Sequence, residues 1–153
     1  MRKIRAEIHL KSIAENALAF KMLTGKRLSA VVKADAYGHG AEEVAFALQG
    51  IVDCFAVALL SEAKAIKTSA CGKDVLILCP PIELLDAIEA VQNGFVCTVT
   101  GMTSAKLVAQ ASEICKIPAR VHLKATPMSA VPSMSRSLMR PWLRMCPSPV
   151  ASA

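Results

Sequence analysis

Five short apolar segments recur along the first four-fifths of the chain. Each contains too few polar positions for a strand with one face in water, so each is predicted to be a strand that is buried on both faces. Their starts are 20 to 25 residues apart, and they read LSAVVK (28–33), DCFAVA (53–58), DVLILC (74–79), GFVCTV (94–99) and ARVHLK (119–124).

The segments between these strands have the apolar spacing of amphipathic helices. Ser12 followed by Glu15 has the spacing of a capping box, and Ser61 is a candidate N-cap. Gly50 and Gly94 stand where helices commonly end. The predicted helices cover residues 12–25, 40–50, 60–70, 81–94 and 103–116.

Strands that alternate with helices at this interval predict an α/β fold with parallel strands and right-handed crossovers. The periodicity itself leaves two architectures open, an open doubly wound sheet or part of a (β/α)8 barrel. A complete barrel needs about 250 residues. As a barrel, this chain of 153 residues would therefore be incomplete.

The pattern ends after residue 124. The last 29 residues contain five of the eight prolines, four of the seven methionines and the only tryptophan, without any glycine or acidic residue. Prolines this dense leave no room for a helix of ordinary length. We therefore predict one domain over residues 1–124 and an irregular or disordered tail over residues 125–153.

The net charge of +6 is unevenly distributed. Residues 1–33 carry eight basic side chains against two acidic ones, whereas residues 34–118 carry five against ten. A nucleic-acid-binding protein would show a clustered basic face with a supporting motif. The sequence has no such motif, so we expect no nucleic-acid partner.

The six cysteines form no CxxC pair and no Cys/His cluster with the spacing of metal ligands, so no metal site is expected. The basic start MRKIRAEIHL is not followed by the apolar region of a signal peptide. No run of eighteen uncharged apolar residues is present either. These features predict a cytoplasmic protein that does not insert into a membrane.

The stretch SAVVKADAYGHG places Lys33 at the end of the first predicted strand, with Tyr37 in the loop that follows. In parallel α/β folds the chemistry collects at the carboxyl ends of the strands. A lysine held among apolar side chains loses hydration and becomes a nucleophile for an aldehyde such as that of pyridoxal phosphate. By position alone, however, a strand-end lysine is usually a solvated terminus, and His39 is better explained as a turn residue than as a metal ligand.

The segment AVVKADAYGHGA closely resembles the pyridoxal phosphate attachment signature of the alanine racemases. The resemblance extends to AEIHLKSIAENA, which is similar to the opening strand and first helix of that family. It also includes DCFAVALLSEAKAIK, which resembles the second strand and its helix, and ARVHLK, which resembles the fifth strand. The resemblance as a whole covers about residues 4–124, roughly four-fifths of the chain.

This resemblance implies a partial (β/α)8 TIM-type barrel that binds pyridoxal 5′-phosphate and interconverts L- and D-alanine. It implies that Lys33 forms the internal aldimine and is the base for the proton on the D-face, and that Tyr37 reaches the cofactor phosphate. Lys124 corresponds to a lysine that is carbamylated in many members. The family is homodimeric.

The chain also departs from the family. After Lys124 the family continues with Thr-Gly-Met and an arginine, but KATPMSAV has Pro127 in place of the glycine and lacks the arginine. The later strands and the C-terminal β-domain, which supplies the opposing catalytic tyrosine, are missing. Tyr37 is the only tyrosine. This change suggests a truncation with an altered reading frame.

Three functions remain open at this point. The chain is an alanine racemase with impaired activity, a barrel protein that binds pyridoxal phosphate without racemising, or an inactive fragment.

Overall fold

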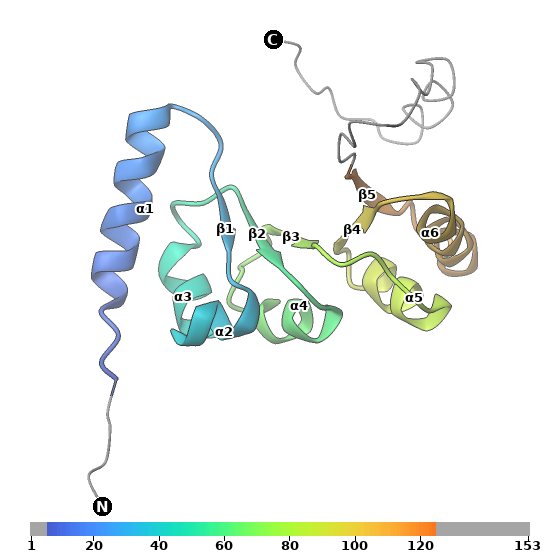
Figure 1. Cartoon of the computed structure of the whole chain (residues 1–153), viewed down its shortest axis with the longest axis horizontal. Helices are drawn as coiled ribbons and strands as arrows, with labels where there is room; N and C mark the ends of the chain where they lie inside the picture. The colour runs from blue at the N-terminus through green and yellow to red at the C-terminus, as the bar shows by residue number, and fades with distance from the viewer. Residues whose placement is uncertain (1–5, 125–153) are drawn as a thin grey trace, which may run out of the picture.

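The structure, a computed structural model, describes residues 6–124 and contains five strands that alternate with helices (Figure 1). The strands are β1 (Ser29–Val31), β2 (Cys54–Val57), β3 (Asp74–Ile77), β4 (Val96–Val99) and β5 (Arg120–Leu123). The helices are α1 (Leu10–Thr24), α2 (Lys33–Gly38), α3 (Ala41–Leu48), α4 (Leu60–Ile66), α5 (Leu84–Gln92) and α6 (Met102–Cys115). The predicted tail over residues 125–153 lies outside the described residues.

All neighbouring strands pair in parallel, and their order in the sheet is β1-β2-β3-β4-β5. The parallel sheet predicted from the apolar segments is therefore confirmed. An open doubly wound sheet reverses its strand order at a switch point. Here every strand lies beside the one that precedes it, as in a barrel. The fold is a partial (β/α)8 TIM-type barrel, of which the described residues provide the first five strands.

The core lies between the sheet and its helices. Successive side chains of a strand point to opposite faces, and the alternate positions of β2, β3 and β4 that face the helices are buried. These side chains belong to one cluster with residues of α3, α4 and α6. The strand positions in this cluster are Phe55, Val57, Val75, Ile77, Cys97 and Val99.

Phe55 is the largest fully buried side chain of this core, and its removal should destabilise the fold strongly. We expect Phe55→Ala to lower the free energy of unfolding by about 3–5 kcal/mol, because it removes apolar contacts and leaves a cavity. Urea denaturation followed by circular dichroism measures this change. Phe46→Ala on α3 is the matched control, since Phe46 is 64% exposed. Equal losses in the two variants would contradict the assigned core.

Two groups of polar contacts fix the amino-terminal ends of the strands. Asp53 accepts a hydrogen bond from the Leu28 N–H (2.7 Å) and lies 3.4 Å from the Lys21 Nζ of α1. Asp74 at the start of β3 forms a bidentate ion pair with Arg120 at the start of β5. The Arg120 hydrogen bonds lower the pKa of the Asp74 carboxyl despite its partial burial. The two groups attach α1 to the sheet and link β3 with β5.

Two predicted helix caps are wrong. Helix α1 begins at Leu10, so Ser12 lies inside the helix and forms no capping box with Glu15. Helix α4 begins at Leu60 with Leu59 at the N-cap, so Ser61 lies in the first turn. In both cases the helix extends further toward the amino terminus than its first polar capping candidate. Helix α2 was not predicted as a helix.

Candidate active site

Lys33 lies at the carboxyl end of β1, where the sequence placed it. The preceding residue, Val32, is buried in the core and donates its N–H to the Ala56 carbonyl oxygen of β2 (2.8 Å). Lys33 follows directly and is half-buried. Because parallel barrels bring their functional groups to this end of the strands, the position suits a reacting lysine.

The chain turns in an unusual way immediately after Lys33. Four successive non-glycine residues, 34–37, have φ between 51° and 57° and form a left-handed turn within α2. This conformation costs roughly 1–2 kcal/mol per residue, because Cβ approaches the carbonyl oxygen too closely. Backbone strain of this kind persists only where surrounding contacts enforce it, and it clusters at functional sites.

Local hydrogen bonds account for part of that enforcement. The Ala36 N–H donates to the Val32 carbonyl oxygen (3.0 Å), and the Gly40 N–H donates to the Asp35 carbonyl oxygen (3.0 Å). The Asp35 carboxylate accepts the Ala41 N–H at the start of α3 (2.7 Å). The left-handed turn is thereby fastened to β1 on one side and to α3 on the other.

Glu62 of α4 supplies the remaining contact, and sequence reasoning did not identify it. Its Oε1 accepts the Ala34 N–H (2.7 Å), and its Oε2 accepts the N–H groups of Ala58 (2.7 Å) and Leu59 (3.1 Å). Burial acts to raise the pKa of the Glu62 carboxyl. The three N–H donors and the nearby Lys33 charge outweigh burial and hold that pKa below its ordinary value, so Glu62 is ionised at neutral pH.

Tyr37 and His39 occupy the end of the turn. The Tyr37 side chain is 61% exposed, so its hydroxyl is open to a ligand. The His39 Nδ1 lies 2.8 Å from the Ala36 carbonyl oxygen, which agrees with its interpretation as a turn residue. Within residues 6–124, no group of three or more His, Cys, Asp or Glu side chains is placed to hold a metal ion.

Lys124 is the last described residue and lies at the carboxyl end of β5. Its N–H donates to the Val99 carbonyl oxygen of β4 (3.0 Å), and its side chain is exposed. Lys33 and Lys124 therefore lie at the same end of the sheet, on its two outer strands. The carbamylation expected for Lys124 stays a prediction.

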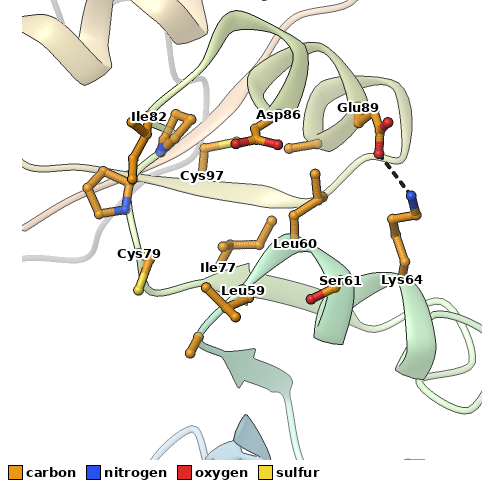
Figure 2. Close-up of a pocket in the computed structure, with 14 residues that line it drawn as sticks. Leu59, Leu60, Ser61, Lys64, Ile77, Cys79, Ile82, Asp86, Glu89 and Cys97 are labelled. Atoms are coloured by element: carbon orange, nitrogen blue, oxygen red, sulfur yellow. Dashed lines mark hydrogen bonds and ion pairs between the residues drawn. The ribbon is translucent and has the colours of Figure 1, made fainter. Parts of the chain in front are cut away.

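A cavity of about 400 Å³ lies between α4 and α5 (Figure 2). Its lining includes Ile77 and Cys97 on the helix-facing side of the sheet, and neither Lys33 nor Tyr37 lines it. An ion pair between Lys64 and Glu89 (2.9 Å) crosses from α4 to α5 (Figure 2). Burial raises the pKa of the Cys97 thiol to about 11. Because neither of the two predicted cofactor-binding residues lines it, the cavity is not the site that the sequence indicates.

None of the helices in residues 6–124 is long and apolar enough to cross a membrane.

Comparison with known proteins identifies the family. The model of the alanine racemase N-terminal domain matches residues 8–126. The alanine racemase of Pseudomonas fluorescens is 37% identical over 112 residues, which cover 73% of this chain and 31% of that protein. The alanine racemase of Neisseria gonorrhoeae is 36% identical over 124 residues, which cover 81% of this chain and 35% of that protein.

Solved structures agree with these sequence matches. The biosynthetic alanine racemase of Pseudomonas aeruginosa superposes with a TM-score of 0.74 and 31% identity, covering 88% of this chain and 37% of that one. The alanine racemase of Streptomyces coelicolor A3(2) gives 0.75 and 30% identity, covering 92% and 39%. The chain spans about a third of the length of the curated relatives it matches. It belongs to the alanine racemase family, whose members are pyridoxal phosphate-dependent amino-acid racemases.

Proposed function

We propose that the chain carries the cofactor-attachment part of an alanine racemase, with Lys33 as the residue that binds pyridoxal 5′-phosphate covalently. The observation that carries the proposal is the position of Lys33 at the carboxyl end of β1, followed by a strained left-handed turn. The chain matches only about a third of the length of its curated relatives. We therefore propose separately that this chain racemises alanine with impaired activity.

The residues present fit the cofactor at two points. A half-buried primary amine suits the cofactor aldehyde, and an exposed phenol four residues later suits its phosphate. A third observation comes from Thr98 of β4, whose buried Oγ1 has no hydrogen-bond partner among residues 6–124. Thr98 alternates with the helix-facing Cys97 and Val99, so it points to the opposite face, which a closed barrel encloses. That face therefore retains a polar group in need of a partner.

When bound, pyridoxal phosphate acts as an electron sink that stabilises a carbanion at the substrate Cα. The chain's own contribution is to bind and orient. The Lys33 Nζ would hold the cofactor at its aldehyde carbon before substrate binds and, once released from that carbon by the substrate amine, would exchange the substrate's α-proton from one face. The Tyr37 hydroxyl donates a hydrogen bond to the phosphate. A carbamylated Lys124 would place a negative charge at the carboxyl end of β5.

The Tyr37 role leads to a specific test with two ligands. Tyr37→Phe removes the hydroxyl and keeps the ring, so the dissociation constant for pyridoxal phosphate should rise about tenfold, the effect of losing one hydrogen bond to a charged group. Spectrophotometric titration measures this constant. Pyridoxal, which lacks the phosphate, serves as the control ligand, and its binding should not change. An equal loss for both ligands would show that Tyr37 does not contact the phosphate.

A further inference from the structure

Glu62 joins the loops that follow two neighbouring strands. Its carboxylate accepts one N–H from the turn after β1 and two from the loop after β2. The contact to Ala34 spans 28 residues of sequence. Of the three hydrogen bonds of Glu62, only the one from Ala34 connects α4 to the turn that contains the attachment lysine.

The role of Glu62 exceeds that of a helix cap. A glutamate at the third position of a helix commonly accepts the N–H of its own N-cap residue, here Leu59. One oxygen, Oε2, satisfies that need together with the Ala58 N–H. The other oxygen, Oε1, is left to accept the Ala34 N–H at 2.7 Å, which no requirement of α4 explains.

The Ala34 N–H belongs to the peptide group that begins at the Lys33 carbonyl. A hydrogen bond to this N–H fixes the orientation of that peptide plane, and with it the ψ angle of Lys33. It also secures the first left-handed residue, Ala34, whose φ is 51°. Because the allowed side-chain rotamers depend on backbone φ and ψ, the directions open to the Lys33 Nζ depend on Glu62.

We propose that Glu62 is a positioning residue, which aims Lys33 at the cofactor aldehyde by holding the Ala34 N–H and the left-handed turn. This inference rests on the proposed attachment of pyridoxal phosphate to Lys33. Glu62 itself touches neither the cofactor nor the substrate in this account.

Glu62→Gln tests the proposal, because it preserves side-chain volume but replaces one acceptor oxygen with an NH₂ donor. Two quantities are measured, the exchange rate of the Ala34 amide by NMR without cofactor, and the rate of covalent attachment of pyridoxal phosphate trapped with borohydride. The Ala34 amide should exchange about tenfold to hundredfold faster, and pyridoxal phosphate should attach slower by a similar factor. This is the size of effect expected for losing a hydrogen bond to a charged group. Glu113→Gln on the exposed face of α6 is the matched control and should change neither.

A second variant separates positioning from a general loss of stability. Glycine adopts a positive φ without the Cβ penalty, so Ala34→Gly in the Glu62→Gln background should recover part of the attachment rate when both variants are compared without urea, where circular dichroism shows each to be fully folded. Unchanged Ala34 exchange in Glu62→Gln, or an unchanged attachment rate, would overturn the proposal. If the wild-type chain attaches no cofactor, the proposed function is wrong, and with it the role of Glu62 in aiming Lys33. The exchange measurement then still decides whether Glu62 holds the turn.

Discussion

The 153-residue chain, saturated with pyridoxal phosphate, is expected to form D-alanine from L-alanine at least about a hundredfold to ten-thousandfold more slowly than a full-length relative. Racemisation removes a proton from one face of the substrate and delivers one to the other, so it needs two positioned acid/base groups, and each contributes about this factor. Lys33 is proposed to be one of them. The only tyrosine, Tyr37, follows Lys33 within the same turn and is proposed to contact the cofactor phosphate, so the chain offers no further tyrosine as the second group.

A coupled assay for D-alanine measures this difference, with the alanine racemase of Neisseria gonorrhoeae as the full-length reference. Turnover close to that of the reference would contradict the account, because it would require a second base elsewhere in the chain. Cofactor attachment without turnover would favour the alternative of a barrel protein that binds pyridoxal phosphate without racemising. If the chain shows no cofactor attachment and no turnover, it is an inactive fragment.

Lys33→Ala is expected to abolish covalent attachment of pyridoxal phosphate altogether. The reaction requires a primary amine at the carboxyl end of β1, and alanine offers none. Lys33→Arg should also fail, although it keeps the positive charge beside Glu62, because a guanidinium does not form the linkage and is never deprotonated in proteins. The fraction of chain that carries the cofactor after borohydride reduction is measured by intact mass.

Lys106→Ala provides the control for this loss, since Lys106 is exposed on α6. Its labelled fraction should equal that of the wild type. Persistent labelling of Lys33→Ala at the wild-type level would mean that the cofactor reacts with other, exposed lysines and that β1 carries no attachment site.

The regular part of the fold was predictable from the sequence. Continuous apolar segments located all five strands within two residues of their observed ends. The prediction of burial on both faces agrees with β2 and β4 but is wrong for β1 and β5, which lie at the two edges of the described sheet and are largely exposed. The position of Lys33 followed from the first of these segments. The order of strands was not predictable from periodicity, because a barrel and a doubly wound sheet repeat the same βα unit. The observed order, each strand beside its predecessor, decides in favour of the barrel.

The left-handed turn after Lys33 escaped prediction for a physical reason. Local conformational preference argues against four successive non-glycine residues with positive φ. In the sequence, only Gly38 and Gly40 indicated an unusual loop. The turn exists because Asp35 and Glu62 hold its ends, and Glu62 lies 28 residues away from the N–H it binds. A contact of that range leaves no periodic pattern in the sequence.

The most direct test of the central claim is to locate the trapped cofactor along the chain. The wild-type protein is incubated with pyridoxal phosphate, reduced with borohydride, digested and analysed by mass spectrometry. The chain contains eleven lysines. The account predicts a phosphopyridoxyl group at Lys33 in preference to the other ten, at cofactor concentrations that leave exposed lysines unlabelled. Labelling spread evenly over the exposed lysines, with Lys33 unmodified, would contradict it.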